Sequence, residues 1–390
     1  MSTNNNDFIT RELEAALTQA KEDFIWEWYT FVKKMTKERL SRSNGRNKDQ
    51  IYEEAKEAFW YELSGNTTGL LTWDFVSKNK DRPWGSYRLS GNAAVVTSWD
   101  IVAQNPDMDW FYGQISTLPC ITFDIVEKNR DTKVWSWYFL SKNPSVASWE
   151  LIIDHARNNR DDVPWNRVSL LQNPNVVRDV SYIEAIRNGA LGRFALPQMN
   201  PHSFTRNPAI TPPSSYSWKM LTEDRNGIWN NVVSQNWDKS LINAINIRWE
   251  DAKPFFLDAQ KCGVHHDVFL HLPSLFPSWD YVVEKHITKH FQRNYYVHLS
   301  RNESIVGGGE FVMDNPENRK YPWNYIVMTR AIKLPSKIEL EVLEKVVLSW
   351  HAQNVICRQI ERSLFDPSYM MCRQRVMREY VSFCAETKVI

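Results

Sequence analysis

The residues with the clearest potential for chemistry are histidines that lie near one cysteine. The nitrogen and sulfur ligands in this stretch are Cys262, His265, His266, His271, His286 and His290. His286 and His290 are four residues apart and would share one face of an α-helix. Imidazole and thiolate groups bind zinc well, but the spacing matches no closed Cys/His site and includes no His-Glu-x-x-His motif. Capping and surface roles are therefore the simpler interpretation, and a metalloprotein using residues 262–290 is the alternative.

Other patterns that could support catalysis are incomplete. Gly307-Gly308-Gly309 lacks the Lys-Ser/Thr of a phosphate-binding loop, so we interpret it as an inserted flexible loop. No Gly-x-Ser-x-Gly motif is present. Acidic residues recur at one position of a repeated pattern, which indicates helix capping rather than a catalytic pair; they are Asp74, Asp100, Asp124, Glu150 and Asp280. The sequence thus predicts no enzyme, no catalytic residue, no bound metal and no cofactor.

The charge balance argues against nucleic acid as a partner. Lys and Arg total 47 and Asp and Glu total 46, so the net charge of +1 provides no long-range field. Arginines do gather near the C-terminus, at Arg358, Arg362, Arg373, Arg375 and Arg378. A nucleic-acid surface is one interpretation of that segment. A solvated face paired with Glu361 and Glu379 is the simpler one.

Composition places the chain among soluble, well-packed proteins. Apolar residues make up 43% and charged residues 24% of 390 residues. Five cysteines, an odd number without a Cys-x-x-Cys motif, are expected to be reduced thiols. No apolar stretch is long enough to span a membrane, and the polar segment Met1–Asn6 is not a secretion signal. We therefore expect a protein that is not secreted.

A repeated pattern explains why 18 tryptophans occur beside only 13 glycines. The chain aligns with itself at a period of about 26 residues. Each unit begins with Ser or Thr, an aromatic residue, Asp or Glu and aliphatic residues, and then reaches Asn, often followed by Pro. Pro-Trp and Leu-Ser-x-Asn complete it. Clear copies begin at Thr72, Ser98, Thr122 and Ser148, and less regular ones at Ser217, Ser278 and Glu310.

This pattern predicts two short helices in each unit. Ser or Thr is a good N-cap, and the acidic residue suits the first turn of the helix. Asn tolerates the left-handed conformation of a C-cap, and a Pro after it cannot continue the helix. Pro-Trp would open the second helix with Pro at its first position. A strand interpretation competes because Trp-Asp-Ile-Val also suits β-structure, but no strict alternation runs through the segments. Helices of two or three turns need stacked neighbours, which predicts an all-α solenoid.

The recurrent aromatic residues are predicted to pack between successive units. Tryptophan combines a large apolar area with one N–H donor, so we interpret these residues as architecture rather than as ligand contacts. The predicted repeat-packing residues are Trp73, Trp84, Trp99, Trp110, Phe123, Trp135, Trp149, Trp165, Trp218, Trp229, Trp279 and Trp323.

Longer helices are predicted at both ends of the repeat region. Residues 1–57 contain an N-terminal helix and linker, 58–180 the regular repeats, 181–334 degenerate repeats with insertions, and 335–390 the C-terminal helices, the last of which begins at Asp366-Pro367. Capping of the array is the expected role of both ends. Docking or oligomerisation helices are the alternative.

The repeat resembles short Trp-rich repeats in proteins of nucleocytoplasmic large DNA viruses. The resemblance is carried by Leu140–Pro144, by Trp99–Val102 with Asn105-Pro106-Asp107, and by Pro164-Trp165. It covers the repeat region and not the two ends, and the unit boundaries blur at 180–260. It implies a structural or scaffolding role in a virion, such as a minor capsid component that contacts capsid proteins or itself. A non-virion adaptor in the infected-cell cytoplasm, binding a host or viral protein, is the alternative.

Overall fold

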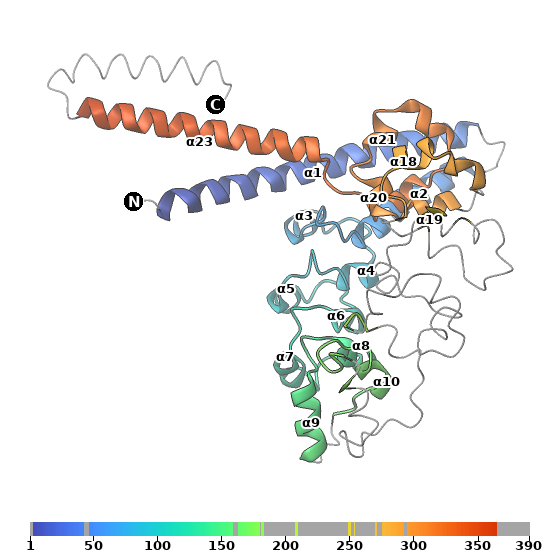
Figure 1. The fold of residues 1–390 in the computed structure, drawn as a ribbon, viewed down its shortest axis with the longest axis vertical. Coiled ribbons are helices and arrows are strands. Elements are labelled where there is room, and N and C mark those ends of the chain that lie inside the picture. Colours follow the sequence, from blue (N-terminus) through green and yellow to red (C-terminus); the bar gives the residue numbers. More distant parts are fainter. Residues whose placement is uncertain are drawn as a thin grey trace. The chain divides into compact units, whose positions relative to one another are not determined.

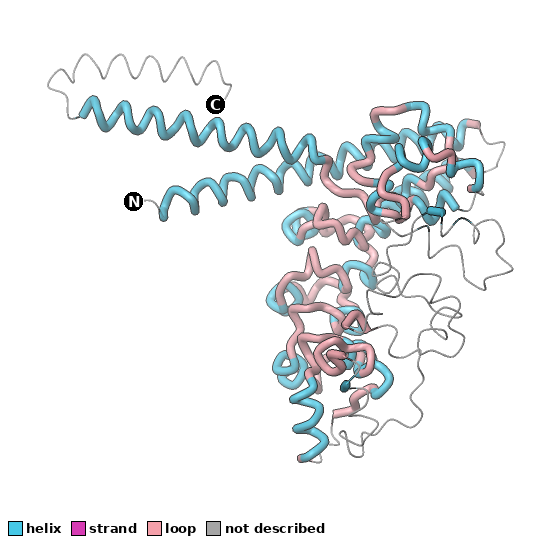
Figure 2. The backbone as a smooth tube through the Cα atoms, viewed as in Figure 1, coloured by secondary structure: helices cyan, strands magenta, loops and turns pink. Residues whose placement is uncertain are grey.

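The chain is all-helical wherever its structure is described. The structure is a computed structural model that describes residues 3–42, 47–158, 163–179, 181–182, 207–209, 249–250, 253, 270, 275–291 and 295–364. These residues contain no β-strand (Figure 2). The helical interpretation of the Trp-Asp-Ile-Val segments is thus confirmed for the described copies. None of the described helices is both long and apolar enough to cross a membrane.

The helices differ greatly in length. The long ones are α1 (Thr3–Ser41), α2 (Lys48–Ser64) and α23 (Ser336–Leu364). The short ones are α3 (Trp73–Lys78), α4 (Ser86–Ser90), α5 (Trp99–Gln104), α6 (Tyr112–Ile115), α7 (Phe123–Lys128), α8 (Trp137–Lys142), α9 (Trp149–Arg157), α10 (Arg167–Leu170), α18 (Trp279–Glu284), α19 (Tyr295–Leu299), α20 (Glu303–Val306), α21 (Glu310–Met313) and α22 (Tyr325–Met328), with 3₁₀ helices η3 (Ile287–His290) and η4 (Pro316–Lys320). Figure 1 labels most of these elements along the ribbon.

The chain divides into two compact units. One combines Met1–Glu27 with Leu334–Ile390, and the other is Trp28–Lys333. The first unit contains the beginning of α1 and all of α23, with Phe24, Ile25 and Leu334 buried. The second unit contains the end of α1, α2 and every short helix.

The short helices begin where the sequence pattern predicts, but they are shorter than expected. The first helices α3, α5 and α7 each have six residues, which is less than two turns. The hydroxyls of Thr72, Thr122 and Ser148 accept a hydrogen bond from the backbone N–H three residues later. Ser98 makes no such bond. Helices this short depend on packing between units rather than on their own hydrogen bonds.

The asparagines that end the first helices do not adopt the expected left-handed conformation. Asn79, Asn105 and Asn129 have φ of −126°, −124° and −116°. Each instead turns its side-chain Nδ2 back to the carbonyl oxygen four residues earlier, at 2.9, 2.9 and 2.8 Å. The asparagine therefore ends the helix by satisfying a free carbonyl group with its side chain, a solution that the residue type alone did not distinguish from a left-handed cap.

The Pro-Trp pair also lies in a different place from the one predicted. Helix α4 begins at Ser86, two residues after Trp84, and α10 begins at Arg167, two residues after Trp165. Pro83 and Pro164 therefore precede the second helix instead of occupying its first position. The tryptophan stands in the connection between the two helices, where its ring can contact both neighbours.

The order of the units in space differs from their order in the chain. Helix α2 contacts α22, and Asn66 Nδ2 donates to the carbonyl oxygens of Thr329 and Ile332 at 3.1 and 2.7 Å, across 263 and 266 residues. Figure 1 shows orange α19 and α20 beside blue α2. Residues 60–66 carry only the second half of the repeated pattern. The last repeat of the chain therefore completes this first, half unit.

The three glycines form a tight turn rather than a flexible loop. Gly307 and Gly309 have φ of 50° and 78°, a region that favours glycine. Gly308 and Gly309 are buried, and a Cβ atom on Gly309 would lie 2.9 Å from the ring of Trp28. The turn joins α20 to α21 and leaves no room for a side chain at Gly309.

Candidate functional site

Asparagine side chains connect successive helix pairs. The ladder asparagines are Asn66, Asn92, Asn143, Asn173, Asn207 and Asn302, all of them buried. Asn92 Nδ2 donates to the carbonyl oxygens of Ser64 and Asn66 at 3.0 and 2.7 Å, and its Oδ1 accepts from Ala94 N at 3.0 Å. Asn143 repeats this arrangement with Ser116 and Leu118. One buried amide thus binds two segments of backbone and fixes how one helix pair lies on the next.

The spacing of these bonds along the chain is not constant. The ladder amides reach back by 26 residues from Asn92 to Asn66, 25 from Asn143 to Leu118, 30 from Asn173 to Asn143 and 34 from Asn207 to Asn173. The insertions are accommodated without loss of the bond.

Hydroxyl groups at one position of the pattern make a second set of bonds between neighbours. The ladder serines are Ser64, Ser90, Ser141 and Ser300, each two residues before a ladder asparagine, and Ser116, which stands two residues before Leu118. Thr329 occupies the same position before Ala331. Ser64 Oγ donates to Trp60 O at 2.8 Å and accepts from Gly85 N of the next pair at 2.9 Å. Thr329 differs because its hydroxyl accepts from Trp28 Nε1 at 3.1 Å in a buried position. Helix α1 therefore occupies the position that a repeat backbone occupies elsewhere.

The tryptophans that precede the second helices, after Pro or at the equivalent position, bind their own unit and contact the previous one. Trp84 and Trp110 donate through Nε1 to the carbonyl oxygens of Asn79 and Asn105, both at 2.8 Å. The ring of Trp110 lies 5.9 Å from that of Trp73 in the preceding unit. Equivalent pairs are Trp99–Trp135 at 5.8 Å, Phe123–Trp165 at 5.8 Å and Trp279–Trp323 at 4.7 Å.

The predicted repeat-packing residues are not buried to the same extent. Trp110, Trp135, Trp165, Trp279 and Trp323 are buried. Trp73, Trp84, Trp99, Phe123 and Trp149 are half-buried. Trp218 and Trp229 lie outside the described residues. Among the predicted tryptophans that precede a second helix, Trp110, Trp135, Trp165 and Trp323 are thus buried and Trp84 is half-buried. Among the predicted aromatic residues that begin a described first helix, only Trp279 is buried.

The second helices have one buried and one exposed face. Leu89, Ile115, Leu140 and Leu170 point inward and are 0–3% exposed. On the outer side lie Tyr61, Tyr87, Phe111 and Tyr138, which are 41–52% exposed and which we call the aromatic row. Large aromatic side chains left in water at one position of successive helices are typical of a binding surface.

The aromatic row continues even where the sequence breaks its pattern. Tyr61, Tyr87 and Tyr138 stand three residues before a ladder serine, whereas Gly113 stands at that position before Ser116. The ring of Phe111 covers this glycine, since a Cβ atom on Gly113 would lie 2.7 Å from Phe111 Cε1. The ring also lies 5.1 Å from that of Tyr87. A residue from another position therefore restores the aromatic surface.

The sequence analysis did not identify the aromatic row. Its signal was present in the Tyr-x-x-Ser spacing of Tyr61, Tyr87 and Tyr138. This tyrosine spacing is less evident in the sequence than the tryptophan pattern. It is also interrupted at Gly113, where Phe111 supplies the aromatic ring from another position.

Helix α23 has a second exposed apolar surface, in the other unit. Leu340, Leu343, Val347, Leu348 and Val355 are exposed on this 29-residue helix. Nothing among the described residues covers them.

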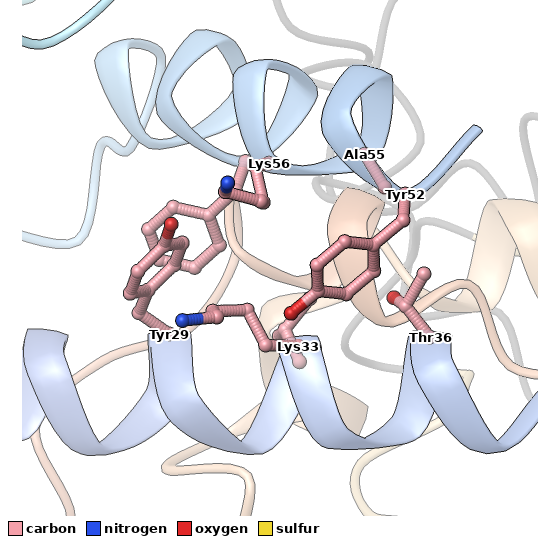
Figure 3. Close-up of a pocket in the computed structure, with 8 residues that line it drawn as sticks. Tyr29, Lys33, Thr36, Tyr52, Ala55 and Lys56 are labelled. Atoms are coloured by element: carbon pink, nitrogen blue, oxygen red, sulfur yellow. The ribbon is translucent and has the colours of Figure 1, made fainter. Parts of the chain in front are cut away.

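A small recess lies between the end of α1 and α2. Figure 3 shows Tyr29, Lys33 and Thr36 of α1 facing Tyr52 and Lys56 of α2 around it. Its volume of about 10 Å³ is far below the roughly 300–1,000 Å³ of ordinary ligand pockets. Lys33 Nζ lies 5.0 Å above the Tyr29 ring and Lys56 Nζ 5.7 Å above the Tyr52 ring. The recess is better explained as helix packing with cation–π contacts than as a small-molecule site.

The described part of the histidine stretch does not have the predicted geometry. His286 has a left-handed backbone with φ of 53° and precedes the 3₁₀ helix Ile287–His290. The two histidines therefore do not share an α-helical face, because the chain turns between them. No group of His, Cys, Asp and Glu side chains within the described residues could hold a metal ion. Cys262, His265, His266 and His271 lie outside that part, as do Arg373, Arg375 and Arg378.

Comparison with known proteins identifies no relative. No protein-family model matches the chain, and the searches of curated proteins and of solved structures also returned no match.

Proposed function

We propose that this protein is a non-catalytic scaffold that acts by binding other proteins. In this proposal, the helix pairs of residues 58–179 and 278–332 form one solenoid-like array of about 26 residues per unit. The recurring bonds of the ladder asparagines and ladder serines support continuous stacking. The bonds from Asn66 to Thr329 and Ile332 support an array that passes from the C-terminal repeats to the N-terminal ones.

The aromatic row carries the functional part of the proposal. Tyrosine and phenylalanine bury a large area with little loss of side-chain freedom, and they are enriched at protein interfaces. Tyr61 lies over Gly85 of the next pair and Tyr87 contacts Phe111, yet all four rings of the row remain 41–52% exposed, unlike the buried leucines. A repeated array displays such side chains at regular intervals along an extended surface. An extended segment or a neighbouring subunit fits that surface better than a small molecule does.

The biological setting of the proposal rests on the viral resemblance of the repeat. Such an origin favours a virion scaffold, such as a minor capsid component bound to capsid proteins or to itself. A soluble adaptor that binds a host or viral protein is the competing setting. Both settings share the same physical activity, which is protein binding through the repeat array.

Mass spectrometry of purified particles distinguishes the two settings. The scaffold proposal expects the chain in particles in constant proportion to the capsid proteins. Presence in infected cells but absence from particles contradicts the virion role and supports the adaptor. Light scattering of the purified full chain tests contact with itself, since self-association gives a mass above 45.9 kDa.

A further inference from the structure

Arg88, Arg330 and Glu62 lie together where the last repeat joins the first, and the positive charge of Arg301 is near enough to act on Arg330. Arg301 and Arg330 directly follow Ser300 and Thr329, and Arg88 comes from α4. We call these three residues the arginine cluster. Glu62, near the end of α2, accepts a hydrogen bond from Arg88, and both of these side chains are largely buried.

A glycine allows two of the arginines to approach one another. A Cβ atom on Gly65 would lie 3.2 Å from Arg88 Cδ and 3.5 Å from Arg330 Nε. A methyl group here would be slightly too close to Arg88 and in ordinary contact with Arg330, so a residue larger than alanine would compete with both side chains for space. The guanidinium group of Arg88 also lies 4.2 Å from the centre of the Tyr61 ring, at the beginning of the aromatic row.

The cluster has more positive than negative charge. Glu62 pairs with Arg88, whereas the guanidinium groups of Arg301 and Arg330 form no hydrogen bond or ion pair with any residue that the structure describes. Burial lowers the pKa of Arg330, and the neighbouring charge of Arg88 lowers it further, against the opposing effect of Glu62. A partly desolvated guanidinium group beside another one is unfavourable unless an anion binds between them.

We propose that Arg88, Arg301 and Arg330 bind carboxylate side chains in an acidic segment of a partner protein. This inference rests on the proposed scaffold function and adds where the partner binds and which charge it carries. Guanidinium groups bind carboxylates through paired hydrogen bonds, which fix orientation as well as charge. Because Tyr61 adjoins the cluster, the segment would place its acidic residues next to apolar ones that cover the aromatic row.

A carboxylate fits this surface better than the phosphates of a nucleic acid. A nucleic acid requires a continuous series of cationic contacts along its backbone. Here Glu62 lies among the arginines, and Asp109 lies beside the aromatic row, where it accepts from Ser86 Oγ at 3.0 Å. The net charge of +1 also provides no extended positive field. The positive charge is local, which suits a few carboxylates of a protein segment.

The test is the affinity of the full chain for labelled oligoglutamate and for oligouridylate of equal length, measured by fluorescence anisotropy at low and high salt. Oligoglutamate should bind more tightly than oligouridylate, and its affinity should fall at high salt. Replacing Arg330 by Gln should weaken this binding about tenfold or more, the value of one charged hydrogen bond. Arg330→Lys should give an intermediate affinity. The matched control is Lys128→Gln, which removes an exposed positive charge at the end of α7 and should have little effect.

Three outcomes overturn the proposal. These are tighter binding of oligouridylate, no binding of either probe, and equal losses in Arg330→Gln and Lys128→Gln. A partner that is still retained by Arg330→Gln but lost when the aromatic row is altered would refute the arginine site and leave the scaffold function standing. Oligoglutamate binding that depends on Arg330, in a chain with no stoichiometric protein partner, would support the site and refute the scaffold function.

Discussion

Replacing Asn143 by Ala should remove one complete connection between helix pairs. The side chain is 3% exposed. Its Nδ2 donates to Ser116 O at 3.0 Å and to Leu118 O at 2.8 Å, and its Oδ1 accepts from Ser145 N at 2.9 Å. The substitution therefore deletes three buried hydrogen bonds and leaves a small cavity.

The expected loss in the free energy of unfolding is about 2–4 kcal/mol. Each intramolecular hydrogen bond contributes roughly 0.5–1.5 kcal/mol net, and a buried group left without a partner costs about 1–3 kcal/mol. Leu118 O keeps its bond from Ile121 N at 3.1 Å, so it is not left unsatisfied. Ser116 O and Ser145 N lose the partner that Asn143 provided, which places the estimate above that for a single bond.

Urea unfolding followed by tryptophan fluorescence measures this loss. Asn175→Ala is the matched control, because Asn175 is an exposed residue of the same type whose Nδ2 donates to Pro144 O at 2.7 Å. It should cost less than about 1 kcal/mol, since water replaces an exposed bond. Equal losses in the two variants would refute the role given to the buried amides, and so would a loss below about 0.5 kcal/mol for Asn143→Ala.

Three further predictions concern burial, backbone conformation and ionisation. Trp323 is fully buried and Trp99 is half-buried. In urea unfolding, Trp323→Ala should lower the free energy of unfolding by about 3–5 kcal/mol and Trp99→Ala by about 1–3 kcal/mol. A larger loss in Trp99→Ala would contradict the packing. Gly309→Ala should lower the melting temperature of the protein more than Gly69→Ala does. Both glycines have positive φ, but only a Cβ at position 309 would contact the indole ring of Trp28. Equal melting temperatures would refute this. Burial and the nearby Tyr321 raise the pKa of Tyr296 to about 12. The folded state therefore favours the protonated phenol, and the stability of the fold is unaffected below about pH 10 and falls between about pH 10 and pH 12. A phenolate absorbance titration should show this late ionisation together with loss of helix, and complete ionisation near pH 10 in the folded protein would contradict it.

The positions of the short helices were predictable because local chemistry determines them. Thr72, Thr122 and Ser148 are caps whose hydroxyls bond within the same turn, so neither partner depends on distant residues. The aliphatic residues that follow these caps indicate which face of each helix is buried. The first helices also end at the predicted asparagines, but the six residues between cap and asparagine make fewer turns than expected.

The order of the units in space was not predictable from the repeat. Asn66 belongs to the same pattern as Asn92, so the sequence indicates that both donate to a preceding unit. It does not indicate that the unit before Asn66 comes from residues 323–332. Long-range pairing depends on which surfaces fit, and one repeat resembles another. The substitution of Thr329 for serine, with Trp28 as its donor, becomes informative only in three dimensions.

The arginine cluster shows a different limit of sequence reasoning. Arg88, Arg301 and Arg330 are far apart in the chain and belong to no common motif. They come near one another because the last repeat adjoins the first, and Gly65 leaves space for the side chains of Arg88 and Arg330. Residues that gather in this way carry no local motif.

The most direct test of the scaffold function compares proteins that copurify with three forms of the full chain from its native source. The forms are wild type, Tyr87→Ser combined with Phe111→Ser, and Val134→Ser, which changes an exposed apolar residue outside the aromatic row. Quantitative mass spectrometry should find one stoichiometric partner with the wild type and with Val134→Ser, and lose it with the double variant. Equal recovery from all three forms, or no stoichiometric partner with the wild type, would contradict protein binding through the aromatic row.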